Sequence, residues 1–358
     1  MKSVALIAST LLLSACHVPT EKEGEGNAAR ADPAAAPTAT DRTSLRFPDI
    51  VTRQPFRDPP ILRAQVLLDR AGFPAGVIDG RKGASYTLAL RGFQTANDLP
   101  VTGTLDEPTL GALNRWRDVP ATRTVAIPAA FAAGPFVPDF PKDAAEQAKL
   151  PFLGYRTVIE ALAERFHTTA ETLAALNPRQ TRTKGVLRVP NIADVDPATL
   201  GKDERGWNRT LQLLGVAPDQ PQADRVVVDK SEGALKAYDA EGQLLAQFPA
   251  TMGSRHDPLP LGNWTIQGIS RNPDFHYNPK LFWDVSDKKP PVLLKPGPNG
   301  PVGVVWLDLS KPHYGIHGTG EPQTIGRAES HGCVRLTNWD AARLAQMVKV
   351  GTRAVFQE

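Results

Sequence analysis

Two histidines and a cysteine lie close together near the C-terminal end of the 358-residue chain. Cys333 follows His331 by two residues, and His317 lies sixteen residues before it. A thiol with a pKa near about 8.5 is mostly protonated at neutral pH, and a neighbouring imidazole can take that proton and later deliver it to a leaving amine. The spacing therefore predicts a cysteine nucleophile with a histidine base. On residue type alone, a buried cysteine that only fills the core remains an alternative.

The residues beside Cys333 also suit acyl transfer. Gly332 lets the backbone approach a substrate and direct N–H groups toward a developing oxyanion. His331 shares a face with Cys333 if the segment is extended, because positions two apart on a strand point the same way. Arg335 offers a planar fork that can hold a carboxylate or fix the loop.

The other cysteine, Cys16, follows a short apolar run that begins after Lys2. A positive charge, about ten apolar residues and small residues before a cleavage point are typical of a secretory signal. The ending Leu13-Ser14-Ala15-Cys16 resembles a bacterial lipobox. The resemblance implies a lipidated Cys16, with His17 after it implying an outer membrane anchor that faces the periplasm. An ordinary signal peptide that contains a cysteine is the alternative. Export would leave Cys333 without a partner thiol in an oxidising compartment, which strengthens its candidacy as a nucleophile.

Composition excludes several classes of protein. The net charge of +3 and the absence of a Lys/Arg run of five or more give no nucleic-acid signature. The chain has no His-Glu-x-x-His motif or comparable ligand spacing, so we expect no metal and no organic cofactor.

The chain changes character several times along its length, which predicts a multidomain protein. The expected parts are a signal peptide (1–15), a disordered Ala/Pro-rich tether (16–57), a helical domain (58–116), a linker (117–151), a small α/β unit (152–193), a second linker (194–224) and a mostly β domain (225–358).

The helical domain shows three helix patterns. Leu62, Val66 and Leu67 recur at helical spacing before Gly72, a second helix is expected over 85–97, and a third begins near Glu107. Two similar loops, 76–80 and 102–106, precede the second and third helices. With Phe93-Gln94 and the run 99–103, the unit resembles the small three-helix peptidoglycan-binding domain. A helical spacer without a ligand is the alternative.

The small α/β unit resembles a LysM glycan-binding module. Helices are expected over 157–166 and 170–176, with Leu176-Asn177-Pro178 after them and a strand over 186–189 that ends at Pro190-Asn191. The opening strand of such a module has one candidate, 154–157. A structural adaptor is the alternative to glycan binding.

Short β-runs and turns follow from residue 225 onward. We expect a sandwich or barrel-like domain with one late helix over 338–348, opened by Thr337 or Asn338 as cap. The expected strands are 225–229, 234–238, 244–248, 264–268, 302–308, 315–317 and 353–356. The stretches 254–278 and 288–301 are expected as long loops over the cleft.

This domain resembles the L,D-transpeptidase catalytic domain. The resemblance is carried by His317-Gly318-Thr319, Gly326, the run Ser330-His331-Gly332-Cys333-Val334-Arg335-Leu336, and the upstream Pro260-Leu261-Gly262-Asn263-Trp264. It implies that Cys333 attacks the third residue of a tetrapeptide stem and expels D-Ala, with His317 as base and acid. It also implies that the Gly318 carbonyl orients His317, that His331, Gly332 and the Cys333 backbone shape the oxyanion site, and that Ser330 and Arg335 support it.

The acyl acceptor stays open on the sequence. An amine of a peptidoglycan stem or of a wall-attached protein would make the protein a transpeptidase, whereas water would make it a hydrolase of the same bonds. A non-enzymatic peptidoglycan-binding lipoprotein is a third possibility, against which the intact His317 and Cys333 argue.

Overall fold

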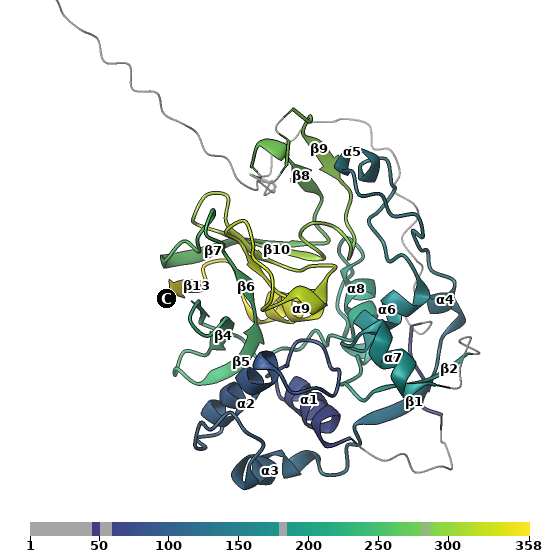
Figure 1. Cartoon of the computed structure of the whole chain (residues 1–358), viewed down its shortest axis with the longest axis vertical. Coiled ribbons are helices and arrows are strands. Elements are labelled where there is room, and N and C mark those ends of the chain that lie inside the picture. The colour runs from purple at the N-terminus through teal and green to yellow at the C-terminus, as the bar shows by residue number, and fades with distance from the viewer. Residues whose placement is uncertain (1–44, 51–58, 179–184, 282–284, 287) are drawn as a thin grey trace, which may run out of the picture.

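The structure is a computed structural model that describes residues 45–50, 59–178, 185–281, 285–286 and 288–358 (Figure 1). The expected signal segment, Cys16 and most of the tether lie outside the described residues. Within the described ranges, none of the helices is both long and apolar enough to cross a membrane.

One part of the expected tether is folded. Leu45 and Phe47 are buried, and the Phe47 ring packs edge-on against Phe131 at 5.0 Å and Phe166 at 5.2 Å. Asp49 forms a β-bridge with Val125. The prediction of a disordered tether up to residue 57 is therefore wrong for residues 45–50, because two large apolar side chains find a core elsewhere in the chain.

The helical domain has the three expected helices, α1 (Pro60–Arg70), α2 (Ala84–Ala96) and α3 (Glu107–Leu113), followed by a 3-10 turn (Asn114–Trp116). The Asp106 side chain caps α3 by accepting from the Thr109 N–H. Gln94 is fully buried, and its amide donates to Thr102, Thr104 and Thr109 while it accepts from the Gly103 N–H. Its bonds fix the second of the two similar loops against α2.

The small α/β unit comprises β1 (Thr122–Ala126), α6 (Val158–Arg165), α7 (Ala170–Leu176) and β2 (Val186–Pro190). Its strands pair antiparallel, with Thr122 opposite Pro190. The predicted opening strand at 154–157 is wrong, because the strand that pairs with β2 lies inside the expected linker 117–151. An insertion between β1 and α6 carries the short helices α4 (Ala129–Ala132) and α5 (Ala144–Gln147).

The second expected linker, 194–224, also contains structure. A 3-10 turn (Pro197–Thr199) precedes α8 (Trp207–Leu214), which buries Trp207, Leu211 and Leu214 in the core of the C-terminal domain. The apolar spacing 207, 211, 214 is that of one helix face.

A nine-stranded mixed sheet dominates the C-terminal domain, in the order β5-β4-β3-β13-β7-β10-β11-β12-β6. Two pairs are parallel, β3 with β13 and β11 with β12. The mostly β architecture with one late helix, α9 (Asn338–Met347), is as expected, and Thr337 caps that helix. The strands are β3 (Arg225–Asp229), β4 (Ala234–Tyr238), β5 (Leu244–Pro249), β6 (Thr251–Met252), β7 (Gly262–Arg271), β10 (Val305–Leu309), β11 (Gly315–His317), β12 (Val334–Arg335) and β13 (Arg353–Gln357).

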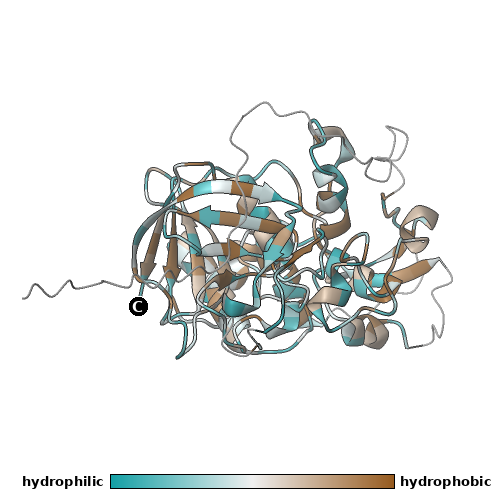
Figure 2. Ribbon diagram, turned by 90° about the horizontal axis from the view of Figure 1, so that it is seen from above, coloured by the Kyte–Doolittle hydropathy of each residue, from teal (hydrophilic) through white to brown (hydrophobic). Residues whose placement is uncertain are grey.

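A separate hairpin, β8 (Phe275–Tyr277) with β9 (Val292–Leu294), stands apart from this sheet beside α5 (Figure 1). Short 3-10 turns lie at Pro279–Leu281 and Pro322–Thr324. Apolar residues gather in the interior strands and helices, and polar residues in the surrounding loops (Figure 2). The main core joins the sheet to α8 and α9, with Trp339, Phe248 and Leu211 among its fully buried side chains.

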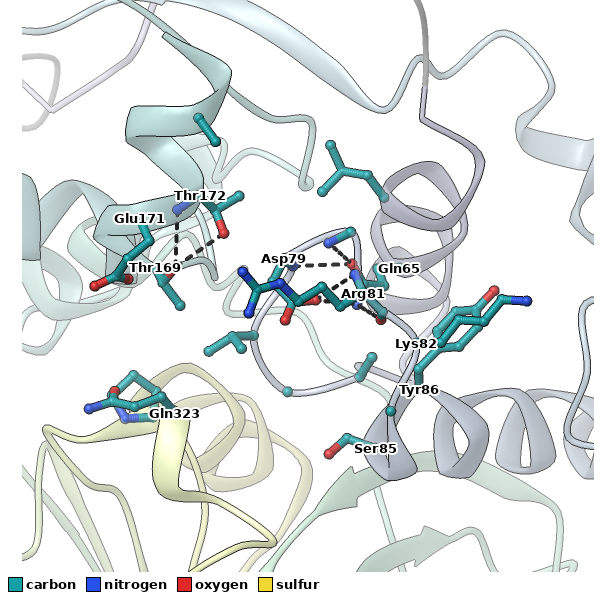
Figure 3. Close-up of a pocket in the computed structure, with 18 of the residues that line it drawn as sticks. Gln65, Asp79, Arg81, Lys82, Ser85, Tyr86, Thr169, Glu171, Thr172 and Gln323 are labelled. Atoms are coloured by element: carbon teal, nitrogen blue, oxygen red, sulfur yellow. Dashed lines mark hydrogen bonds between the residues drawn. The ribbon is translucent and has the colours of Figure 1, made fainter. Parts of the chain in front are cut away.

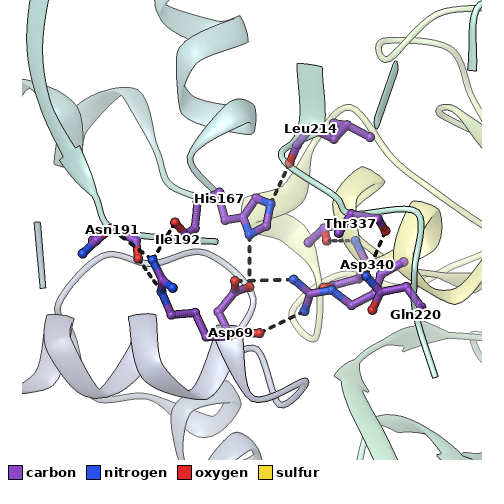
Figure 4. Close-up of polar contacts among 11 residues, drawn as sticks. Asp69, His167, Asn191, Ile192, Leu214, Gln220, Thr337 and Asp340 are labelled. Carbon is purple, nitrogen blue, oxygen red and sulfur yellow. Dashed lines mark hydrogen bonds and ion pairs between the residues drawn. The ribbon is translucent and has the colours of Figure 1, made fainter. Parts of the chain in front are cut away.

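A buried polar cluster joins the three units of the protein, which are the helical domain, the small α/β unit and the C-terminal domain (Figure 4). Asp69 of α1 accepts from His167, which follows α6, at 3.0 Å, and its carboxylate pairs with Arg343 of α9 at 3.4 Å. The other His167 nitrogen lies 2.8 Å from the Leu214 carbonyl, and the ring stacks on Trp339 at 5.0 Å. Burial alone would raise the pKa of Asp69, but the charges and hydrogen bonds of His167 and Arg343 outweigh it and hold that pKa below its usual range.

We predict that Asp69→Ala destabilises the protein by about 3 kcal/mol, because it leaves the buried Arg343 charge without its carboxylate. Asp118→Ala, at a side chain 92% exposed, is the control and should change stability by less than about 0.5 kcal/mol. Urea denaturation measures both. Since the pKa of Asp69 is depressed in the folded state, its stabilising effect should be complete above about pH 5 and lost as the pH falls. Equal midpoints for the two variants would contradict this account.

Candidate active site

Cys333 lies in the turn just before β12 and is buried, with 6% of its surface exposed. It belongs to a buried apolar cluster whose other members come from the hairpin, from β10 and the turn before it, and from the insertion of the small α/β unit. They are Phe275, Leu294, Val302, Trp306 and Leu153. We call this cluster the apolar cover of Cys333.

The sheet brings His317 beside the cysteine segment. β11 and β12 run parallel, with Ile316 opposite Val334 and His317 opposite Arg335. Cys333 immediately precedes β12, so this pairing places the cysteine turn alongside β11, the strand that ends in His317. The sixteen-residue spacing between the two residues is the length of the loop that returns the chain to this position.

The His317 ring is held from two directions. Its Nδ1 lies 2.8 Å from the Gly318 carbonyl oxygen, which can only accept, so Nδ1 carries the proton. In a neutral ring this leaves Nε2 as the basic nitrogen. The ring also stacks on Trp306, with centroids 5.7 Å apart and an interplanar angle of 23°. The contact between Gly318 and His317 is the one that the sequence resemblance implied.

Gly332 occupies a position that favours glycine. Its φ is +92°, and a Cβ there would lie 2.7 Å from Cε1 of Tyr314. A larger residue would meet both backbone strain and a steric clash. The half-buried His331 precedes it. The turn at 331–333 can therefore present successive backbone N–H groups beside the thiol.

Ser330 and Arg335 hold the ends of this turn. Ser330 Oγ donates to the Cys333 carbonyl at 2.6 Å and accepts from the Gly253 N–H at 2.6 Å, which ties the turn to the segment after β6. Arg335 donates to the Glu329 carbonyl at 3.4 Å. Of its two sequence-based roles, fixing the loop is the one that this contact supports.

The expectation of long loops over 254–278 and 288–301 is wrong in part, because these stretches contain β7, β8 and β9. Phe275 and Leu294 from them belong to the apolar cover, and the insertion of the small α/β unit joins them through Leu153. The Leu153 N–H donates to Pro296 and its carbonyl accepts from Asn299, while Lys289 pairs with Asp143. The sequence did not predict this contribution, because 117–151 was expected to be a linker. No cluster of three or more His, Cys, Asp or Glu side chains suited to a metal occurs in the described ranges.

Comparisons with known proteins agree with this geometry. A family model described as "L,D-transpeptidase catalytic domain" matches residues 223–356, and one described as "Putative peptidoglycan binding domain" matches 57–113. The "Putative L,D-transpeptidase in ATP synthase subunits region ORF 5" of Fuscovulum blasticum is 33% identical over 165 residues, which are 45% of this chain and 82% of that protein.

The chain belongs to the L,D-transpeptidase family.

Two further proteins resemble this L,D-transpeptidase. The "Putative L,D-transpeptidase YkuD" of Bacillus licheniformis is 28% identical over 54% of this chain and 90% of its own. L,D-transpeptidase 3 of Mycobacterium tuberculosis, a solved structure, is 18% identical with a TM-score of 0.30, and the match covers 37% of this chain and 60% of that one. Structural likeness this low adds nothing to the family assignment.

Sequence reasoning missed two polar residues behind the histidine of this L,D-transpeptidase. Asn338, the first residue of α9, accepts from the Val304 N–H and donates to Glu164 of α6 at 3.0 Å. A Cβ on Gly318 would come within 2.3 Å of Asn338 Oδ1, so Asn338 packs directly against the residue that orients His317. Glu164 also accepts from Tyr155 at 2.7 Å. No local pattern could reveal a contact between residues 174 positions apart.

Burial raises the pKa of Glu164 to about 8, so the side chain stays protonated at neutral pH. A carboxyl group whose pKa is raised in the folded state stabilises the fold fully at pH values below its unfolded-state pKa of about 4.3. This contribution to stability is lost as the pH rises toward 8. Glu164→Gln cannot ionise. We predict that the melting temperature of the wild type falls by about 3 °C or more relative to this variant between pH 5 and 8.

The exposed Glu171→Gln serves as the control and should show no such trend. Differential scanning calorimetry across this pH range measures it. A constant difference between wild type and Glu164→Gln at every pH would contradict a neutral buried Glu164.

Proposed function

We propose that the protein is a cell-wall L,D-transpeptidase in which Cys333 is the nucleophile and His317 the general base and acid. The single observation that carries the proposal is the pairing of β11 with β12, which sets His317, with its Nδ1–H committed to Gly318, beside the cysteine turn. Nε2 is then available for the thiol proton.

The proposed first step cleaves a tetrapeptide stem. The Cys333 sulfur attacks the carbonyl carbon of the third residue while Nε2 of His317 takes the thiol proton. The oxyanion faces the N–H groups of the turn at 331–333. The C–N bond then breaks, His317 returns the proton to the departing D-Ala amine, and a thioester remains on Cys333.

In the second step an amine attacks the thioester carbonyl, gives its proton to His317 and expels the Cys333 thiolate. The acceptor would be a stem amine, giving a 3→3 crosslink, or an amine of a wall-attached protein. The apolar cover supports aminolysis over hydrolysis, because a thioester among Leu153, Phe275 and Leu294 is shielded from bulk water. Hydrolysis of the same thioester by water is the alternative.

We predict that the wild-type chain, incubated with a disaccharide–tetrapeptide and an amine acceptor, gains an acyl mass on Cys333, releases D-Ala and yields a crosslinked product. Cys333→Ala should abolish D-Ala release, and His317→Gln should slow it by about 10²–10⁴-fold. Mass spectrometry follows the products, and thermal unfolding verifies that both variants are folded.

The alternatives give different products in that experiment. Tripeptide alone in the presence of the acceptor would show a hydrolase. A folded wild type that forms no acyl-enzyme and releases no D-Ala would contradict both enzymatic functions and leave a peptidoglycan-binding protein.

The role of the small α/β unit is also a proposal. Its likeness to LysM rests on the sequence pattern and on the β1–α6–α7–β2 order. Its buried contacts, His167 with Asp69 and Glu164 with Asn338, favour the adaptor alternative, since they join it to both neighbours.

Lipidation of Cys16, with an outer membrane anchor facing the periplasm, stays a prediction from the sequence. If it is correct, the wild type expressed in a Gram-negative host will fractionate with membranes, and Cys16→Ala will move to the soluble periplasmic fraction. Immunoblots of the fractions measure this. A wild type that is soluble, or a variant that stays with the membranes, would contradict the anchor.

A further inference from the structure

A pocket of about 620 Å³ lies where the three units meet (Figure 3), and its lining shares no residue with the apolar cover of Cys333. One wall is the loop of the peptidoglycan-binding domain that contains Arg81, and a second is α7. The third wall is the segment Pro322–Arg327 of the catalytic domain. None of the three units forms this pocket alone.

The catalytic wall belongs to the loop that joins the two proposed catalytic groups. This loop leaves β11 after His317 and returns at Cys333, and its middle part lines the pocket. The Gly326 N–H donates to Thr251 at 2.8 Å, and Thr251 pairs with Arg335 in the sheet. A ligand in the pocket would therefore contact the same loop as the reacting stem.

The pocket lining carries three cationic side chains against two carboxylates, those of Asp79 and Glu171, and so has a net positive charge. Arg81, Lys82 and Arg327 line it and are exposed, and within the described ranges none of the three side chains forms an ion pair. The nearby Asp79 already accepts from the Gln65 amide and the Arg81 N–H. Arg81 extends from its loop toward α7 and Gln323 (Figure 3). An arginine fork binds a carboxylate well through two parallel hydrogen bonds.

The pocket also offers surface and hydrogen-bonding groups. Leu62 and the Tyr86 ring line it. Tyr86 is 5% exposed, and its buried hydroxyl has no hydrogen-bond partner among the described residues. That hydroxyl is too buried for a ligand to reach, so the accessible polar groups of the lining are those of residues such as the exposed Gln323.

We propose that this pocket binds a carboxylate-bearing peptide stem of a second peptidoglycan strand, distinct from the stem that reacts at Cys333. The inference deepens the proposed function, on which it rests. Arg81 and Arg327, from two different units, would share the carboxylates, and the apolar lining would contact the alanine methyl groups or the sugar. The pocket would hold one strand of the wall against the catalytic loop while another is acylated.

The test uses the full chain carrying Cys333→Ala, which cannot be acylated, and isothermal titration calorimetry with a disaccharide–tetrapeptide. We expect a binding event that Arg81→Glu and Arg327→Glu each weaken by about tenfold or more, corresponding to the loss of a charged hydrogen bond. Arg91→Glu, an exposed arginine of α2 outside the pocket, carries the same charge change and should alter the affinity less than about twofold.

Two further probes identify the recognised chemistry. The free tetrapeptide should show the same sensitivity to both variants, whereas a peptide-free chitooligosaccharide should not. Sugar binding equal to muropeptide binding, or wild-type affinity in both variants, would overturn the proposal. All three arginines are exposed, so the variants are expected to fold. If a charge-reversed variant fails to fold, Arg81→Ala and Arg327→Ala repeat the test.

The outcomes separate this proposal from the proposed function. If the wild type forms the thioester and the variants bind unchanged, the proposed binding role of the pocket is wrong and the transpeptidase function stands. If both variants lose binding but the wild type forms no thioester, the pocket binds the stem and the transpeptidase function is wrong.

Discussion

The fold depends on a single buried carboxylate, Asp69, whose partners come from two other parts of the chain. An isolated ionised carboxylate in the interior is very costly, and here His167 and Arg343 offset that cost only when all three units are in place. This interaction therefore couples the stabilities of the three units. Arg343 lies on α9, the helix that follows the cysteine turn, so the same interaction also fixes where the catalytic loop ends.

A second polar contact carries this dependence to the active site. Glu164 of the small α/β unit bonds Asn338, and Asn338 packs against Gly318, whose carbonyl holds His317. His317 is therefore positioned partly by a unit that the sequence presents as separate. The insertion of that unit also reaches Cys333 through Leu153. What resembles a string of modules is, around the thiol, one packed structure.

The sequence predicted the elements whose signals are local. The three helices of the first domain, α7, α9 with its Thr337 cap and most strands of the large sheet follow from periodicity and turn residues. The candidate site was also local, since His317 and the run from Ser330 to Arg335 lie within nineteen residues. The structure places these residues together, and their roles remain part of the proposed mechanism.

What the sequence could not predict depends on distant partners. β1 was missed because an insertion separates it from α6, so the pattern of its module is interrupted. Phe47 packs on Phe131 and Phe166, which lie far along the chain from it. β6 and β12 are two-residue strands, too short for any alternation to register. Glu164 and Asn338 became recognisable as a pair only in three dimensions.

The parallel pairing of β11 with β12 has a topological consequence. Antiparallel neighbours can be joined by two residues, but parallel neighbours require a crossover of about a dozen residues or more. The long excursion between His317 and Cys333 is thus demanded by the sheet itself. Once such a length of chain must leave the sheet and return, its outer part is free to vary without moving either end. In this protein that outer part lies against the first domain, so a requirement of strand geometry has become a point of communication between domains.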